Sequence, residues 1–351
     1  MEDITDNNPE ENNNDPIENT PEVNPIQQPM INQLDADILA FNQFIRKIKG
    51  ELKKVIVGQD KMINLLMVGL FADGHIILEG VPGIAKTLTA KLFSKTISVD
   101  FSRIQFTPDL MPADVIGTMV FNAKTTEFDF KKGPIFSNIV LIDEINRAPA
   151  KTQSALFEVM EERQISVDGT TYKMEEPYMV LATQNPIEQE GTYKLPEAQL
   201  DRFVFRIRLN YPSLEEEQYL LRKFNTPTKR NDLLNISTVI NADEIKKFRG
   251  LINQVHISDQ LTDYIAQIIH NTRNNGDLFL GASPRASLAI MQTSKAFAAI
   301  HGRSFVTPDD IQQMCYPVLN HRVILNSEKE IEGTEPEEII KEIITKIEVP
   351  R

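Results

Sequence analysis

The chain has 351 residues, of which 41% are hydrophobic and 25% charged, enough for two folded domains with real cores. Its formal net charge of −13 argues against a general affinity for nucleic acid, because neutralising phosphates requires clustered Lys and Arg. A single cysteine, Cys315, excludes a disulfide within the chain and fits a reducing cytosol.

The first segment, residues 1–34, is acidic and rich in Asn and Pro, and no basic residue precedes Arg46. A segment with so few clustered apolar residues cannot bury enough surface to offset its ordering entropy. It lacks the basic start and apolar core of a signal peptide, and no apolar stretch of the chain is long enough to span a bilayer. We therefore expect a disordered acidic tail and a cytoplasmic protein without a membrane span.

From Asp35 onward the pattern is that of alternating helices and strands. Apolar residues first recur at helical spacing, and further helices are expected at Gln59–Phe71 and Thr87–Ser94. Short apolar runs, typical of buried strands, lie at His75–Glu79, Arg103–Phe106, Ile139–Ile142, Tyr178–Ala182 and Val204–Leu209. Such alternation predicts a mostly parallel sheet covered by helices, and so a three-layer α/β domain over residues 35–212.

Two segments interrupt the alternation and are typical of β-hairpins. Residues 117–134 hold two β-prone stretches around a polar linker. Residues 164–176 hold two more around Asp168-Gly169, a strong hairpin signal because both turn positions favour positive φ.

After Tyr211 the chain becomes helical, and we predict a helical lid domain over residues 213–351. Helices are expected at Glu215–Phe224, Ala242–Val255, Asp259–Thr272, Pro284–Ile300 and Pro308–Val318. Thr307 before a proline favours a helix start. Thr334 and Glu337 predict a capping box for a last helix, whose isoleucine stripe is expected to pack in the core.

The strongest chemical signal is GVPGIAKT at 80–87, which follows a strand and opens a helix as a phosphate loop does. Backbone N–H groups of such a loop favour anionic phosphates. Lys86 can reach the β- and γ-phosphates of ATP, and Thr87 can ligate Mg²⁺. The usual second glycine is Ala85 here, and alanine is expected to fit only with a negative φ. The expected contact residues are Gly80, Val81, Pro82, Gly83, Ile84, Ala85, Lys86, Thr87 and Leu88.

Two further strands end in polar residues. Asp143 and Glu144 follow the strand Ile139–Ile142, where Asp143 can hold the Mg²⁺ shell and Glu144 can polarise a water for attack on the γ-phosphate. Asn185 follows a later strand and can orient that water, although an Asn before a proline can also simply form a turn.

Together these residues resemble the AAA+ ATPases, and specifically the MoxR family. The resemblance covers roughly residues 35–325 and rests on GVPGIAKT at 80–87, LIDEINRAP at 141–149, ATQNP at 182–186, LPEAQLDRF at 195–203 and GASPRA at 281–286. Alanine before the loop lysine is a trait of that family. The hairpin at 117–134 resembles the insert in helix 2 shared with magnesium chelatase and the MCM helicases, and the hairpin at 164–176 resembles the insertion before sensor 1.

The resemblance implies roles that spacing alone does not give. Asn185 matches sensor 1, Arg202 matches the arginine finger offered to the neighbouring subunit's γ-phosphate, and Arg285 matches sensor 2. The segment Val57-Gly58-Gln59 resembles the backbone beside the adenine, and Arg147 is a weaker candidate for the subunit interface. Without the resemblance, Arg202 could equally be a surface charge, and Arg285 could pair with a local carboxylate.

The resemblance also implies the activity: Mg²⁺-dependent hydrolysis of ATP that drives remodelling or maturation of a protein partner, often a von Willebrand factor A domain protein. Self-association into a ring is expected, with a hexamer as the expected form. Two alternatives stay open. One is a nucleotide-gated scaffold with little turnover, against which the complete catalytic set argues. The other is a nucleic-acid motor related to the MCM helicases, for which Lys131 and Lys132 are the one adjacent basic pair around the first hairpin.

Overall fold

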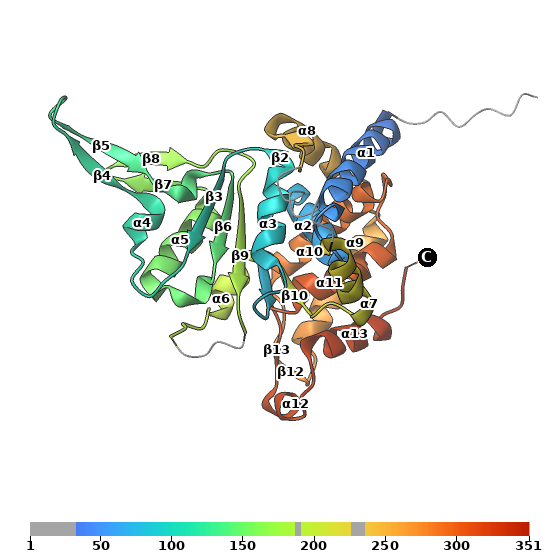
Figure 1. The fold of residues 1–351 in the computed structure, drawn as a ribbon. Helices are drawn as coiled ribbons and strands as arrows, with labels where there is room; N and C mark the ends of the chain where they lie inside the picture. Colours follow the sequence, from blue (N-terminus) through green and yellow to red (C-terminus); the bar gives the residue numbers. More distant parts are fainter. Residues whose placement is uncertain (1–32, 187–190, 226–235, 351) are drawn as a thin grey trace, which may run out of the picture. The chain divides into compact units, whose positions relative to one another are not determined.

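The centre of the fold is a five-stranded parallel sheet with the order β10-β1-β9-β6-β3 (Figure 1). The computed structural model describes residues 33–350 except 187–190 and 226–235. Its sheet strands are β1 (His75–Gly80), β3 (Phe101–Gln105), β6 (Ile139–Asp143), β9 (Met179–Gln184) and β10 (Phe203–Leu209). All five strands were expected from the apolar runs, and the predicted α/β fold is confirmed.

Helices cover both faces of this sheet (Figure 1). Ile77 of β1 packs in a core with α5, whereas its neighbours Ile76 and Leu78 pack in a second core with α2 and α3. The alternation follows from the pleat of a strand, which sends successive side chains to opposite faces. The helices of this part are α1 (Gln33–Lys53), α2 (Asp60–Phe71), α3 (Lys86–Lys95), α4 (Pro112–Ile116), α5 (Ala150–Glu162) and α6 (Glu197–Leu200), with short 3₁₀ helices η1 (Pro134–Phe136) and η2 (Ile145–Arg147).

Both predicted hairpins are present. They are formed by β4 (Gly117–Asn122) with β5 (Glu127–Lys132), and by β7 (Gln164–Val167) with β8 (Thr170–Lys173). Asp168 and Gly169 both take positive φ, 49° and 76°, as a tight two-residue hairpin turn requires. The hairpins contact each other, because the ring centroids of Phe130 and Tyr172 lie 4.7 Å apart.

The rest of the described chain is mainly helical, as predicted. Its elements are α7 (Leu214–Phe224), α8 (Ala242–Asn253), α9 (Asp259–Arg273), α10 (Pro284–Ile300), α11 (Pro308–Leu319), α12 (Ser327–Ile331) and α13 (Pro336–Lys346). Two short strand pairs were not predicted: β2 (Ile97–Ser98) with β11 (Ile240–Asn241), and β12 (Leu278–Leu280) with β13 (Ile324–Leu325). Of the helices in the described ranges, none has both the length and the apolar character needed to cross a membrane.

The predicted capping box of the last helix is wrong. Helix α13 begins at Pro336 with Glu335 as its N-cap, and no side chain caps its first turn. The Glu337 carboxylate instead contacts Arg208 and Asn320, both at 3.3 Å. The Glu337 carboxylate therefore forms an ion pair with another element and does not cap its own helix. The isoleucine stripe is buried as expected, at Ile339, Ile340, Ile343 and Ile344.

The predicted acidic tail and the predicted boundary between the two domains both stay predictions. Helix α1 begins at Gln33, two residues before the expected start of the folded part, and residues 1–32 lie outside the described residues. Gln33–Arg351 form one compact unit, in which α1 packs against α10: Asn42 Nδ2 donates to the carbonyl of Ile300. A division between residues 212 and 213 stays a prediction.

Candidate nucleotide-binding and hydrolysis site

The predicted phosphate loop connects β1 to α3. A side chain at Gly80 would bring its Cβ within 2.5 Å of Ile84 Cδ1 and 2.9 Å of the Leu209 carbonyl, so the strand can turn into the loop only with glycine there. Gly83 takes a φ of 87°, which glycine adopts without strain. Helix α3 begins at Lys86, so its free N–H groups face the loop, as an anion site requires.

The expectation of a negative φ at Ala85 is wrong. Ala85 has φ 63° and ψ 25°, the left-handed conformation that the usual glycine would adopt. For an L-residue this conformation costs roughly 1–2 kcal/mol, and such strain is typical of functional loops. The loop therefore keeps its backbone path with alanine instead of changing it.

A polar cavity of about 480 Å³ lies over this loop. Besides loop residues, its walls contain Asp143, Glu144 and Asn185, the three residues predicted at the ends of β6 and β9. They converge because parallel strands present their carboxyl ends at one edge of the sheet. Lys86 Nζ donates to the carbonyls of Gly80 and of Gln184, the latter at 3.1 Å, and so lies across the opening between the two strands.

Asp143 and Thr87, the two predicted metal ligands, contact each other. Thr87 Oγ1 donates to Asp143 Oδ1 at 2.9 Å. Adjacent ligands around octahedral Mg²⁺, each at about 2.0–2.1 Å from the ion, lie about 2.9 Å apart, so this pair fits the ion. Within the described residues, no group of three or more His, Cys, Asp or Glu could hold a metal, so phosphate oxygens would have to complete the shell.

Two side chains of β3 hold the acidic pair. Arg103 Nε forms an ion pair with Asp143 Oδ2 at 2.6 Å, and Gln105 Nε2 donates to Glu144 Oε2 at 2.7 Å. Arg147 Nε lies 3.1 Å from the same Glu144 oxygen. The Glu144 carboxylate is therefore oriented by protein donors at the edge of the cavity.

Thr183 connects the two acids from β9. Its hydroxyl donates to Asp143 Oδ1 at 3.2 Å and accepts the Glu144 backbone N–H at 3.0 Å. Glu144 itself has a φ of 57°, so the chain turns sharply as β6 ends. This hydrogen bond fixes that turn and with it the direction of the Glu144 side chain.

A second cavity, of about 450 Å³, lies on the other side of the loop and is more apolar. Val57 and Gln59 line it, as expected for the segment beside a base, together with Ile84, Leu88 and residues of α7. A Cβ on Gly58 would lie 2.6 Å from Glu216 Oε1, so glycine lets this segment and α7 approach. Because Pro82, Gly83, Ala85 and Leu88 line both cavities, a nucleotide can place its phosphates in one and its base in the other.

Arg202 and Arg285 are not part of this site. Arg202 precedes Phe203, which pairs with His75 at the start of β1, whereas the loop follows Gly80 at the end of β1. At about 3.3 Å per strand residue, the two ends are roughly 15–20 Å apart. Arg202 therefore lies at the opposite edge of the sheet from its own subunit's phosphate loop.

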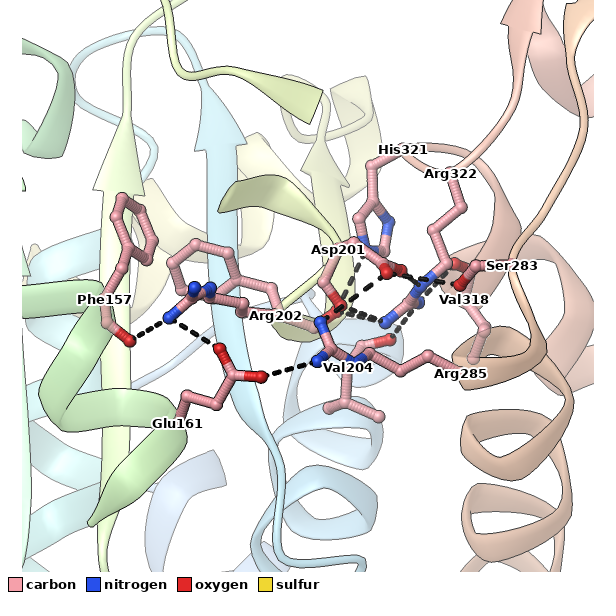
Figure 2. Close-up of polar contacts among 11 residues, drawn as sticks. Phe157, Glu161, Asp201, Arg202, Val204, Ser283, Arg285, Val318, His321 and Arg322 are labelled. Atoms are coloured by element: carbon pink, nitrogen blue, oxygen red, sulfur yellow. Dashed lines mark hydrogen bonds and ion pairs between the residues drawn. The ribbon is translucent and has the colours of Figure 1, made fainter. Parts of the chain in front are cut away.

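Figure 2 shows that the two arginines belong to one cluster of charged residues, here called the arginine cluster: Glu161, Asp201, Arg202, Arg285 and Arg322. Glu161 accepts from Arg202 at 2.8 Å and from Arg285 at 2.7 Å. Three arginines face two carboxylates here, so the cluster has one positive charge in excess. Arg202 and Arg285 also line a cavity of about 210 Å³.

Comparisons with known proteins agree with this geometry. Residues 75–205 match the model of the ATPase family associated with various cellular activities (AAA), and residues 270–343 match that of the AAA lid domain. Chaperone MoxR1 of Mycobacterium tuberculosis is 43% identical over 311 residues, which cover 86% of this chain and 81% of that protein. The uncharacterized protein YeaC of Bacillus subtilis is 43% identical over 316 residues, covering 89% and 98%. A crystal structure of a proposed ATPase from Cytophaga hutchinsonii superposes with a TM-score of 0.83 at 43% identity, covering 90% of this chain and 98% of that one.

The chain belongs to the MoxR family of AAA+ ATPases. As a family member it binds and hydrolyses ATP, and the phosphate loop and its polar cavity are where that chemistry fits. Three polar residues that line the polar cavity were missed by the sequence reasoning: Arg103, Gln105 and Thr183. Arg103 and Gln105 alternate around a buried Ile104 near the end of a predicted strand, a signal that would have placed both on one face.

Proposed function

We propose that this chain hydrolyses Mg²⁺-bound ATP in sites completed by two adjacent subunits, and that the cycle remodels or matures a protein partner. The observation that carries the proposal is the separation of Arg202 and Arg285 from the phosphate loop of their own subunit. The two arginines lie together in a cluster with a surplus positive charge, which suits a neighbour's phosphates.

Within one subunit, different residues of the polar cavity bind the phosphates, hold the metal and activate the water. The loop N–H groups and Lys86 bind the phosphates, and Thr87 with Asp143 would hold the Mg²⁺, which supplies charge neutralisation of the phosphoryl oxygens when bound. Glu144, oriented by Gln105 and Thr183, accepts a proton from the attacking water. Asn185 lines the same cavity and orients that water.

The neighbouring subunit supplies Arg202 as the arginine finger and Arg285 as sensor 2. A γ-phosphate entering between these two guanidiniums would replace part of their shared contact with Glu161, so both arginines engage the same anion. An arginine finger stabilises charge on the transferring phosphoryl group and contributes about 10³–10⁵ to the rate in systems that use one. Arg147, which contacts Glu144, remains a candidate for the same interface.

Sites of this kind require a head-to-tail interface, in which one face of a subunit contacts a different face of the next. Such interfaces close into rings or continue as helical arrays, and do not form two-fold dimers. A ring is therefore the proposed assembly, with a hexamer as the expected form.

A protein client is the proposed partner. One relative with 43% identity is named a chaperone, which supports a role in remodelling or maturation. A von Willebrand factor A domain protein is the expected client class, and the cytoplasm is the expected location, in keeping with the single cysteine. The net charge of −13 argues against the nucleic-acid motor.

The proposal is tested by measuring ATP binding and ATP turnover of two variants, Lys86→Ala and Glu144→Gln. Lys86→Ala removes a phosphate contact, so calorimetry should show no ATP binding by the folded variant. Glu144→Gln keeps the side chain's shape but not its basicity, so ATP should stay bound while turnover falls about 10²–10⁴-fold. Wild-type turnover by the Glu144→Gln variant would exclude Glu144 as the base, and unchanged affinity of the Lys86→Ala variant would exclude residues 80–87 as the phosphate site.

A further inference from the structure

The start of β10, which directly follows Arg202 in the chain, is held by the residues that follow α11. Asn320 Nδ2 donates to the Arg206 carbonyl at 3.0 Å, and His321 Nε2 lies 2.9 Å from the Phe203 carbonyl. Since a carbonyl only accepts, Nε2–H donates to it, and burial lowers the pKa of His321 well below its usual value. The end of a lid helix is thereby hydrogen-bonded to the strand next to the finger.

Arg322 makes the densest of these contacts (Figure 2). Its side chain is only 2% exposed, and its Nε donates to Asp201 Oδ1 at 2.6 Å. One Nη2 group donates to the backbone carbonyls of Asp201 at 2.9 Å and Phe203 at 2.7 Å. The residues on both sides of Arg202 are therefore fixed by one guanidinium, which leaves Arg202 itself little backbone freedom.

Asp201 brings a second lid helix to the same point. Ser283, the N-cap of α10, donates to Asp201 Oδ2 at 3.2 Å, and Arg285 in the first turn lies 3.6 Å from the same oxygen. Asp201 thus joins the start of α10 to the end of α11, directly beside the finger in the sequence.

We propose that Arg322 and Asp201 are positioning residues for the finger Arg202, so that the lid of one subunit sets the rate of hydrolysis in the next. The inference rests on the proposed role of Arg202 in trans. This role differs from a purely structural one. Arg322 is needed in the subunit that donates the finger, and it is not needed in the neighbouring subunit whose bound ATP is hydrolysed.

The contacts of Arg322 explain why another cation cannot replace it. A lysine would keep the charge, but it lacks the planar fork that reaches the Asp201 carboxylate and the backbone carbonyls of Asp201 and Phe203 at once. The strand start would then be free to shift, and a misplacement of about 1 Å at a reacting group can cost about 10²-fold in rate.

The first measurement is steady-state ATPase activity of Arg322→Lys. We expect kcat to fall about 10–100-fold while KM for ATP stays unchanged, because the variant leaves the nucleotide cavities of its own subunit intact. Arg303→Lys is the matched control: Arg303 also pairs with a buried lid carboxylate, Asp310, at 2.6 Å, but makes no contact with the arginine cluster in the described part of the chain. It should keep wild-type kcat.

The deciding measurement mixes subunits with different defects. Arg322→Lys subunits mixed with Glu144→Gln subunits should recover turnover, because the Glu144→Gln neighbour supplies a well-placed finger. Arg202→Ala subunits should likewise recover with Glu144→Gln subunits, but not with subunits that carry both Glu144→Gln and Arg322→Lys. A general folding or lid defect would instead abolish activity of Arg322→Lys subunits in every mixture.

The outcomes separate this inference from the proposed function. Wild-type kcat for Arg322→Lys, or rescue of Arg202→Ala by the double variant, would overturn the inference alone. Failure of Arg202→Ala and Glu144→Gln subunits to rescue each other, despite co-assembly, would overturn the finger in trans and the inference with it. If Arg322→Lys subunits do not assemble, Asp201→Asn replaces Arg322→Lys in both mixtures. Asparagine keeps an acceptor oxygen but loses the charge, and the expected results are the same.

Discussion

Ala85 shows how a single residue keeps the phosphate loop in shape at a cost in stability. Its left-handed backbone costs roughly 1–2 kcal/mol, whereas glycine would avoid that strain but lose about 0.5–1 kcal/mol in chain entropy. We therefore expect Ala85→Gly to raise the free energy of unfolding by up to about 1 kcal/mol in urea titrations, with ATP binding retained.

The control for Ala85→Gly is Ala90→Gly, inside the helix α3 that follows Ala85. Ala90 is buried within α3, where glycine costs about 1 kcal/mol in helix propensity and loses packing as well. The two substitutions should thus have opposite signs. Equal destabilisation by both would contradict the left-handed conformation at residue 85.

His75 makes the stability of the sheet depend on pH. Its Nδ1 accepts the Val180 N–H at 3.0 Å and its Nε2 lies 3.1 Å from the Met160 carbonyl, so the buried ring is neutral and donates through Nε2. Burial lowers the pKa of His75 to about 4 from its usual value of 6.5. Because the folded pKa is the lower one, the stabilisation is complete above pH 6.5 and is lost as the pH falls towards 4.

We expect this effect to reach about 3 kcal/mol for His75 alone. His75→Asn offers a donor and an acceptor but does not titrate, so it serves as the reference. The difference in free energy of unfolding between wild type and His75→Asn should shrink as the pH is lowered from 7.5 to 4.5. A difference that stays constant over this range would exclude His75 as the titrating group.

At the scale of elements, the starts of α11 and α13 differ although both looked like capped helices in the sequence. Thr307 caps α11, where its N–H and Oγ1 both donate to Asp310 Oδ2, at 2.8 Å and 2.9 Å. Thr334 has no such role at α13. Thr307→Ala should therefore cost about 1 kcal/mol of unfolding free energy and Thr334→Ala almost none, as measured by chemical denaturation. Equal costs would contradict the assignment of the two caps.

These elements also show what the sequence could predict. Apolar runs bounded by turn residues were enough for the sheet strands, and Asp168-Gly169 was enough for a hairpin, because both signals are local. The pair β2 with β11 joins two-residue strands far apart in the chain, and so has no local signal. Glu337 found a partner in Arg208 across the fold, which only the tertiary structure determines.

At the scale of the whole molecule, the sequence could predict some features of the candidate site and not others. That the loop, Asp143 and Glu144 lie together could be predicted, because their motifs follow single strands of one parallel sheet. Arg103 and Gln105 contact those acids only because β3 pairs with β6 in a given register, which the sequence does not state. The distance of Arg202 from its own loop likewise follows from the pairing of β10 with β1.

The central claim is that no single subunit contains a complete hydrolytic site, and a mixture of Arg202→Ala and Glu144→Gln subunits tests it most directly. Each variant should be nearly inactive alone, since one lacks the finger and the other the base. After co-assembly, an Arg202→Ala subunit keeps an intact cavity and can receive the finger of a Glu144→Gln neighbour. We predict that the mixture regains ATPase turnover. A mixture that co-assembles and stays as inactive as its components would show that Arg202 does not act on a neighbouring site.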